Sequence, residues 1–549
     1  MTAMLKEFQL SQKAFTKKHR TVNHRSLLDD SSALSKMLEM MPPRLICDKL
    51  VGIYFNNYEK SLRILHIPTF LGECEQFWET RETQASTFTG FIPQLTTVLA
   101  IASSLDDSDN LTGEMSEGRL SATTHCGLVE AWLDGLNGKR RIELSTLRTQ
   151  SLLLLARQTR LTRVDEMWNA TGALVRSAMT MGLHRDPTES PNISIFQGEQ
   201  RRRLWMTIVE MDLQTSLTCG MPTMVREADF TCCSPANVDD LDLSEVMTEC
   251  PVSKPLDEWT DSLSQVTLAR SLPQRLEAVS VVSNINLETH YGEVLEHGRK
   301  LEDFLQDLPA TLKFDYMSKE VNEGPGRLLG RVLLDAYIRR ALLCLYRPFA
   351  LNALGEGTFS EARRACVRSS LIILSHQDAF DPDVADLDVV NSKKYWDLFH
   401  VICKNDIMQA ALSVCFEIKI MSHPLLSPTA GMIPMKASIH PQDQSVLANP
   451  TERNSTWTKA SLTRTIENTL NSLMRRINEF GSDLKDPLCL SIVLQSVRTK
   501  SSQEKKEALM REGATSVIKA CQQYLLQGDG SAGHNVNGSS NVVRKDIIW

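Results

Sequence analysis

Residues 199–222 read EQRRRLWMTIVEMDLQTSLTCGMP, and this stretch decides the fold class. Its apolar side chains recur at intervals of four and three residues, which places them on one face of a helix. These residues are Leu204, Ile208 and Met211. Gly220 and Pro222 end the helix, because glycine accepts the left-handed conformation after a helix and proline cannot continue one. The pattern predicts a helix over about Glu199 to Leu217.

Charged residues of this helix need partners. Arg201, Arg202 and Arg203 lie in its first turn, where the helix dipole disfavours cations. Carboxylates nearby in the sequence are expected to neutralise them, and the candidates are Glu199, Asp186 and Asp212. Asp212 lies among apolar residues, so we expect an arginine to pair with it.

Helical periodicity extends along the chain in both directions. The further expected helices are residues 147–154, 165–182, 328–346, 395–418 and 462–477. Asp165 is expected to cap the second of these, and Gly182 to end it in the left-handed conformation. No convincing alternating strand pattern is found, so the sequence predicts an all-α fold, a large array of many helices.

Composition excludes several classes of protein. The chain has 549 residues, of which 42% are hydrophobic and 23% charged, as in ordinary soluble globular proteins. The net charge of -7 argues against a surface that grips nucleic acid throughout, since that needs clustered lysine and arginine. No apolar run approaches the roughly 20 residues that span a bilayer, so no membrane association is expected. The thirteen cysteines have no framework spacing and are expected to be reduced, mostly core thiols.

The chain divides into three expected regions. Residues 1–44 form a basic, partly flexible segment with six lysines and arginines between Lys6 and Arg25. A solvated start or an arm for nuclear import or DNA contact would both fit this segment. Residues 45–525 form the helical domain, with loops near 238–262 and 419–456. Residues 526–549 are expected to be a flexible tail.

The sequence contains partial matches to the motifs of two enzyme classes, a protein kinase and a terpene cyclase, and both matches are incomplete. His184, Arg185 and Asp186 resemble a kinase catalytic loop, but Pro191 occupies the position of the metal-binding asparagine, and Asn192 comes one residue late. A kinase is therefore excluded.

The helical composition also suggests a terpene cyclase, which holds magnesium through two acidic motifs. The stretch Asp239-Asp240-Leu241-Asp242-Leu243 lacks the final acid of the first motif. Asn405 and Asp406 begin the second, but Gln409 and Ser413 replace two of its oxygen ligands. No catalytic, cofactor-binding or metal-ligating residue is assigned.

Five ordered segments together resemble one known family. They are Tyr54-Phe55 with Leu65-His66-Ile67-Pro68-Thr69-Phe70; Gly182-Leu183-His184-Arg185-Asp186; Arg201-Arg202-Arg203-Leu204-Trp205 with Asp212; Gly220-Met221-Pro222; and Leu345-Tyr346-Arg347-Pro348-Phe349. The stretch from about Cys47 to Phe349 is similar to the fungal transcription factor regulatory domain, the middle homology region of Zn2Cys6 zinc-cluster factors. Met206 and Met221 depart from that family's usual Trp and Arg.

The resemblance implies structural roles for the motif residues. They are His66, Pro68, Phe70, Gly182, Leu183, His184, Arg185, Asp186, Arg202, Arg203, Trp205, Asp212, Gly220, Pro222, Arg347, Pro348 and Phe349. His184 is expected either to bind the carbonyl groups that end its helix or to pack against Trp205.

The resemblance also implies a nuclear regulator of transcription, for example of a metabolic or secondary-metabolite gene cluster. Its partners would be promoter DNA, reached directly or through a zinc-cluster partner, and the transcription machinery, with a homodimer or heterodimer open. No cysteine precedes Cys47, so zinc is expected only if a zinc cluster is encoded upstream. Three hypotheses would explain a chain without a zinc cluster: the gene model is truncated, the protein acts through a DNA-binding partner, or the domain works as a free modulator. The alternatives are a modulator or repressor without its own DNA binding and, remotely, a helical biosynthetic enzyme.

Overall fold

The computed structural model describes most of the chain. The described residues are 30–106, 122–159, 163–283, 291–314, 325–352, 359–384, 392–422, 457–477, 484–498 and 503–530. Within these ranges the chain forms seventeen α-helices and short 3-10 turns, without a strand, which confirms the all-α prediction. The basic residues Lys6 to Arg25, the expected loop beyond residue 422 and the tail beyond residue 530 lie outside the described residues.

The helices follow one another with short connections. The first eight are α2 (Asp30–Glu39), α3 (Arg44–Asn57), α4 (Ile67–Gln84), α5 (Phe91–Ala102), α6 (Ala122–Gly135), α7 (Leu144–Gln158), α8 (Val164–Thr180) and α9 (Ile195–Cys219). The remainder are α10 (Leu263–Val282), α11 (Tyr291–Gln306), α12 (Pro325–Ala350), α13 (Ser360–Ser375), α14 (Ser392–Ile402), α15 (Lys404–Ser422), α16 (Lys459–Arg475), α17 (Lys485–Arg498) and α18 (Gln503–Gly530).

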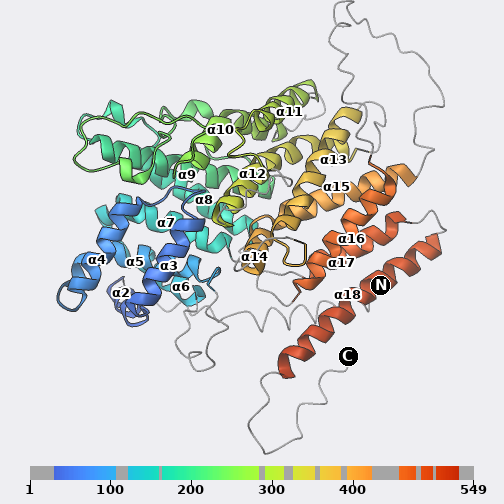
Figure 1. The fold of residues 1–549 in the computed structure, drawn as a ribbon, viewed down its shortest axis with the longest axis horizontal. Helices are drawn as coiled ribbons and strands as arrows, with labels where there is room; N and C mark the ends of the chain where they lie inside the picture. Colours follow the sequence, from blue (N-terminus) through green and yellow to red (C-terminus); the bar gives the residue numbers. More distant parts are fainter. Residues whose placement is uncertain are drawn as a thin grey trace, which may run out of the picture.

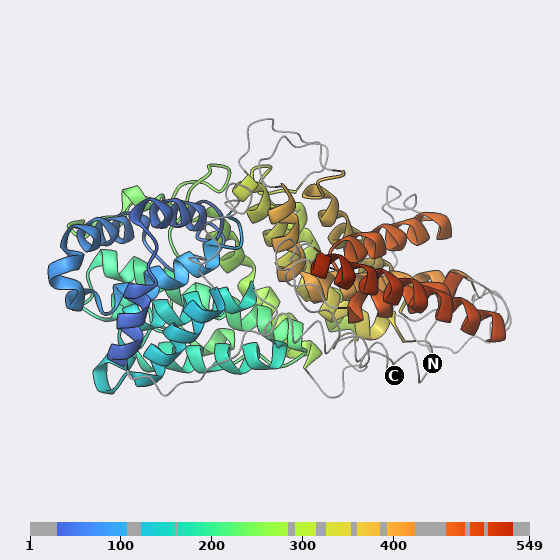
Figure 2. The same cartoon turned by 90° about the horizontal axis from the view of Figure 1, so that it is seen from below.

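The molecule is elongated, and its helices are arranged roughly in chain order. Figures 1 and 2 show α2 to α9 at one end and α13 to α18 at the other, with α12 between them. Neighbouring helices pack in a continuous series from α8 on α9, through α10 and α12, to α13, α15, α17 and α18. One hydrophobic core therefore runs through both ends, and a smaller one lies under α18.

Helix α9 is longer and more deeply buried than the sequence pattern predicts. It begins at Ile195, where the Ser194 hydroxyl accepts a hydrogen bond from the Gln197 amide, and it ends at Gly220 with φ of 69°. Eighteen of its residues are buried, and charged side chains are among them. The expected single apolar face is therefore incomplete, because other helices cover α9 on its polar sides as well.

Two expected helix boundaries differ from the structure. Asp165 does not cap α8: the helix begins at Val164, and Asp165 in its first turn accepts hydrogen bonds from Arg163. The expected end is confirmed, since Gly182 has φ of 74° and the Leu183 amide binds the Ala178 carbonyl.

The expected helix over residues 395–418 is two helices, α14 and α15, which meet at Cys403. The break lets α14 pack on the 3-10 turn η9 (His376–Ala379), where Phe399 contacts the His376 ring. Helix α15 continues to Ser422, inside the segment 419–456 expected to be a loop, and α18 extends to Gly530, inside the segment 526–549 expected to be a tail.

None of the twelve cysteines described with side chains forms a disulfide bond, and seven of them are buried. None of the described helices combines the length and apolar composition needed to cross a membrane.

Candidate functional site

Three of the five family segments meet around the N-terminal half of α9, and Gly220-Met221-Pro222 follows its C-terminal end. The centre of this region is a set of charged and polar side chains, which we call the buried ionic cluster. It consists of Glu59, Arg63, His66, Asp186, Glu199, Arg202, Arg203 and Asp240. It joins the start of α4, the segment after α8, α9, and the 3-10 turn η7 (Asp240–Asp242).

Asp240 is the hub of the buried ionic cluster. Its Oδ1 atom accepts a hydrogen bond from Arg203 Nη1 at 2.6 Å and another from Arg63 Nη2. Its Oδ2 atom accepts from the Ile67 amide at 2.8 Å. Burial raises the pKa of Asp240, but the two arginines outweigh burial and the net shift is downward. One carboxylate thus binds two buried guanidinium groups from different parts of the chain.

The His66 and Pro68 segment is attached to the same aspartate. His66 Nε2 lies 2.9 Å from the Asp240 carbonyl oxygen, and its Nδ1 lies 2.8 Å from the Thr69 hydroxyl. Burial lowers the pKa of His66, so the ring is neutral at pH 7. Pro68 lies in the first turn of α4, where its missing amide hydrogen costs no helical hydrogen bond. These contacts fix the start of α4 against η7.

Phe70 continues this segment into the hydrophobic core. Its ring centroid lies 5.5 Å from that of Phe55 and 5.2 Å from that of Phe91. The motif residues Phe55 and Phe70 therefore pack against each other and join α3 to α4.

Glu59 is a further carboxylate of the buried ionic cluster, and it lies in the segment between α3 and α4. Its carboxylate accepts hydrogen bonds from the Ile64 and Leu65 amides at 2.6 and 2.8 Å and from the Tyr54 hydroxyl at 2.6 Å. Burial raises the pKa of Glu59 to about 7, against the opposing effect of Arg63. Glu59, Arg63 and Asp240 were not among the expected site residues, although Arg63 lies two residues before the Leu65-His66 segment.

Asp186 and Arg202 form the second ion pair of the cluster. Arg202 donates from Nη2 and Nε to the two carboxylate oxygens at 2.8 and 3.0 Å. These hydrogen bonds hold the pKa of Asp186 well below its usual value. Glu199 lies 3.4 Å from Arg203 Nε and also accepts from the Ala236 amide at 3.0 Å. The expected pairing is confirmed for Arg202 with Asp186 and for Arg203 with Glu199. Arg201 instead donates to the Met181 carbonyl at 3.4 Å.

The residues before Asp186 anchor the turn after α8. Leu183 is buried and Arg185 is exposed. The His184 ring lies 6.2 Å from the Trp205 ring, and its carbonyl accepts a hydrogen bond from the Thr231 amide at 2.9 Å. The expected packing of His184 against Trp205 is therefore present.

The expected arginine partner of Asp212 is wrong. Asp212 is 1% exposed, and its Oδ2 atom accepts a hydrogen bond from the Met224 amide at 2.7 Å. Burial raises the pKa of Asp212 to about 6, and Arg176 lowers it only from a distance. The carboxylate holds the segment after Gly220 and Pro222 against α9, where the Pro222 carbonyl also accepts from the Trp168 indole at 3.2 Å. A backbone amide, instead of a guanidinium group, binds Oδ2 of this aspartate, while its buried Oδ1 makes no hydrogen bond with the described residues.

The last family segment lies away from the buried ionic cluster. Arg347, Pro348 and Phe349 form the C-terminal end of α12. The Phe349 ring packs against Tyr291 at 5.0 Å, and Arg347 Nε donates to the Ser413 hydroxyl at 3.2 Å. These residues join α12 to α11 and α15.

The aspartates of the two incomplete terpene cyclase motifs are paired with basic side chains. Lys254 Nζ lies 2.5 Å from Asp239, and Asp406 forms two hydrogen bonds with Arg340 at 2.5 and 2.8 Å. Among the described residues, no group of three or more His, Cys, Asp or Glu side chains is placed to hold a metal ion. The arrangement holds helices and segments together, and its carboxylates are already neutralised.

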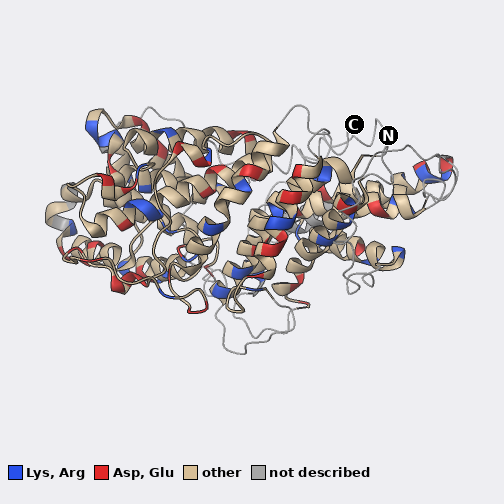
Figure 3. Ribbon diagram, turned by 90° about the horizontal axis from the view of Figure 1, so that it is seen from above, with Lys and Arg blue, Asp and Glu red and all other residues tan. Residues whose placement is uncertain are grey.

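Charge of both signs is distributed over the described helices. Figure 3 shows lysine and arginine interspersed with aspartate and glutamate at both ends of the molecule. Contact with nucleic acid phosphates requires clustered cations, and mixed charge does not supply them.

Comparison with known proteins agrees with the motif geometry. Residues 51–256 match the family described as fungal specific transcription factor domain, and this range contains the whole buried ionic cluster. Transcription factor opdR of Penicillium oxalicum is 31% identical over 477 residues, covering 85% of this chain and 57% of that protein. The Equisetin cluster transcription factor eqxF of Fusarium heterosporum is 25% identical, covering 84% of this chain and 66% of that protein.

A third relative carries the zinc-cluster term in its name. The Zn(2)-C6 fungal-type transcription factor mpsB of Macrophomina phaseolina is 29% identical over 350 residues, covering 62% of this chain and 46% of that protein. The chain thus spans between about two fifths and two thirds of the length of these and similar curated relatives. No solved structure matches the chain. The chain carries the fungal specific transcription factor domain, and residues 51–256 are that domain.

Proposed function

We propose that the chain regulates transcription of a fungal gene cluster for a secondary metabolite. The observation that carries this proposal is the match of residues 51–256 to the fungal specific transcription factor domain. Relatives named as transcription factors of the equisetin and fusarisetin A clusters support the type of target. The protein acts in the nucleus on promoter DNA and the transcription machinery.

The helical domain serves as the regulatory part of this function. The net charge of -7 and the mixed surface charge favour promoter contact through a zinc-cluster segment or a zinc-cluster partner. A modulator that binds such a partner and not DNA is the second candidate. The enzyme alternative has less support, because the acidic groups of its motifs are paired with Lys254 and Arg340.

Gene deletion in the native fungus tests the regulatory role. Transcript profiling of the deletion strain is expected to show altered expression of a contiguous group of biosynthetic genes, and reintroducing the 549-residue chain is expected to restore it. Unchanged transcripts under conditions that express the chain would contradict the proposal.

Promoter binding separates direct action from action through a partner. Chromatin immunoprecipitation of a tagged chain is expected to recover the promoters of the affected genes. The purified chain is then tested on the same promoter fragments by electrophoretic mobility shift. Binding by the purified chain indicates direct contact, and binding only after addition of nuclear extract indicates a zinc-cluster partner.

A further inference from the structure

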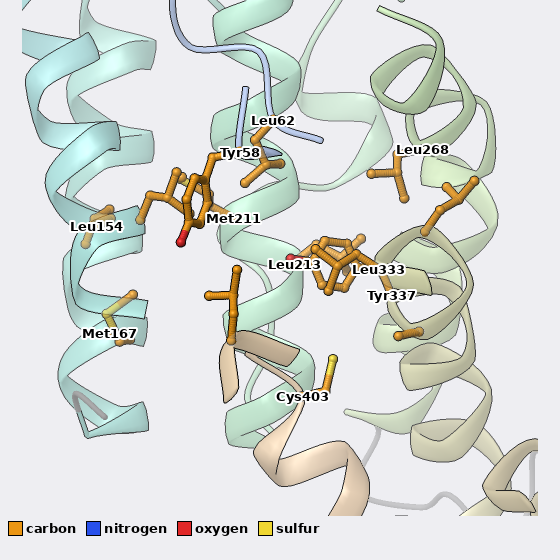
Figure 4. Close-up of a cluster of buried hydrophobic side chains, with 14 of the residues drawn as sticks. Tyr58, Leu62, Leu154, Met167, Met211, Leu213, Leu268, Leu333, Tyr337 and Cys403 are labelled. Carbon is orange, nitrogen blue, oxygen red and sulfur yellow. The ribbon is translucent and has the colours of Figure 1, made fainter. Parts of the chain in front are cut away.

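A cavity of about 330 Å³ lies between α7, α8, α9, α12 and the junction of α14 and α15. Its volume is at the lower end of the range of about 300–1,000 Å³ that is typical of ligand sites. Apolar walls come from Leu154, Met167, Met211 and Ile402. Figure 4 shows Leu154, Met167 and Met211 gathered between α7, α8 and α9. The cavity lies apart from the buried ionic cluster, on the other half of α9.

The polar part of the cavity wall is fixed by hydrogen bonds. Glu210, Gln214 and Arg340 line it, and each is only 4% exposed. Arg340 Nη1 donates to Gln214 Oε1 at 2.7 Å, and Gln214 Nε2 donates to Glu210 Oε1 at 2.6 Å. Arg275 and Asp406 hold the two ends of this series. The polar wall is therefore formed before any ligand arrives.

The charges of this wall cancel. Arg275 binds Glu210 through two hydrogen bonds at 2.6 and 2.8 Å, and Arg340 binds Asp406 in the same way. A charged ligand would lose its hydration here without gaining an unpaired counter-ion. The wall favours an uncharged ligand.

Hydrogen-bond donors remain available in the wall. A guanidinium group has five N–H donors, and Arg340 uses three of them on Asp406 and Gln214. The Tyr337 hydroxyl, beside Arg340 in the cavity lining, makes no hydrogen bond with the described residues. Two kinds of donor next to one another suit a ligand that presents an acceptor oxygen.

We propose that this cavity binds an uncharged, mainly apolar small molecule whose carbonyl oxygen accepts hydrogen bonds from Arg340 and Tyr337. Thr218 and Lys404 also line the cavity and are half-buried, and Arg163 in the lining is exposed. The proposal depends on the cavity alone and goes beyond the regulatory role. A ligand here contacts α8 from one end of the molecule and α14 from the other, so its binding stabilises their packing.

A fluorescent ketone tests the proposal with the full chain. The probe is 6-propionyl-2-dimethylaminonaphthalene, which is uncharged, apolar and carries one carbonyl group. Titration is expected to give saturable binding at one site with a blue shift in emission. The matched probe is 6-dimethylamino-2-naphthoic acid, whose carboxylate is expected to bind at least about tenfold more weakly because of its desolvation.

Substitutions place the probe in this cavity. Thr218→Trp places a bulky side chain in the cavity lining and is expected to abolish saturable binding, whereas Thr180→Trp on the exposed end of α8 leaves it unchanged. Tyr337→Phe keeps the ring but removes the donor, and is expected to weaken binding about fivefold to tenfold. Circular dichroism and thermal unfolding establish that each variant is folded.

Three results would overturn the proposal. The first is the absence of saturable binding to the unmodified chain. The second is equal affinity for the ketone and the carboxylate. The third is unchanged ketone affinity in both Thr218→Trp and Tyr337→Phe. If Thr218→Trp does not fold, Tyr337→Phe and the pair of probes decide the question. Because no promoter is used, failure here is distinct from failure of the regulatory function.

Discussion

Arg203 and Asp240 are 37 residues apart in the chain and 2.6 Å apart in space, and both are buried. Arg63 binds the same carboxylate from a position 177 residues away. This contact joins α9, the segment before α4, and η7 into one unit. Within the buried ionic cluster, the Asp240 carboxylate therefore binds two buried cations, one of which also pairs with Glu199.

Asp240→Asn is expected to destabilise the protein by about 3–5 kcal/mol, because it leaves Arg63 and Arg203 buried beside a neutral group. Thermal and urea unfolding measure this loss. Asp242→Asn is the matched control, since Asp242 lies in the same turn with its side chain 40% exposed. The loss of stability in Asp242→Asn should stay below about 1 kcal/mol. Equal effects of the two substitutions would show that Asp240 is not the hub.

His376 is expected to make stability depend on pH. Its side chain is fully buried against Phe314, and burial lowers its pKa to about 4, although Asp335 opposes the shift. A histidine whose pKa is lower in the folded state contributes stability above pH 6.5, and this is lost as pH falls towards 4. The loss is roughly 3 kcal/mol from a shift of this size.

His376→Gln removes this titration. Unfolding of the parent and the variant is compared at pH 7.5 and pH 5, and the variant should lose less stability between them. A variant whose stability falls as steeply as the parent's would show that His376 is not the group responsible.

Asp212 is expected to affect the pH dependence of stability in the opposite direction to His376. Its pKa is raised to about 6 by burial, so the folded state binds a proton more readily than the unfolded state between pH 4 and 6. Ionisation of Asp212 therefore reduces stability as pH rises through this window. Asp212→Asn keeps an oxygen for the Met224 amide. At pH 7 it should be as stable as the parent or up to about 2 kcal/mol more stable, as measured by urea unfolding.

A clear loss of stability in Asp212→Asn at pH 7 would contradict this account. It would mean that the negative charge itself, which Arg176 attracts, is needed for stability. Repeating the comparison at pH 4, where the parent carboxyl is protonated, separates the charge from the hydrogen bond.

Gly298→Ala is expected to separate α11 from α12. A methyl group at Gly298 would overlap the Tyr346 ring and hydroxyl, so one of the helices must shift. Overpacking of this kind costs about 1–3 kcal/mol, which thermal unfolding would detect. Gly292→Ala in the same helix has open space around the added methyl and should be neutral or slightly stabilising. If both variants melt like the parent, the close approach of α11 and α12 is not important for stability.

The sequence by itself determined the helical class, the position of α9 and the ends of two helices. The spacing of Leu204, Ile208 and Met211 predicts α9 because helical periodicity is a local pattern. Gly182 and Gly220 predict the ends of α8 and α9, since each glycine takes the left-handed conformation directly after its helix. The family segments could also be found, since they are short and contiguous. The pairing of Arg202 with Asp186 could be predicted from the sequence, because both residues belong to these segments.

Only the tertiary structure decided which polar groups are buried and what they bind. Asp240 lies in an acidic stretch that reads as a solvated loop, yet packing of η7 against α4 and α9 places it between two arginines. Asp212 accepts a hydrogen bond from the Met224 amide, and not from an arginine, because the chain returns to α9 after Gly220. The cavity beside Arg340 depends on helices from both ends of the chain. Periodicity is a local property, whereas ion pairs and cavities depend on which distant segments are packed together.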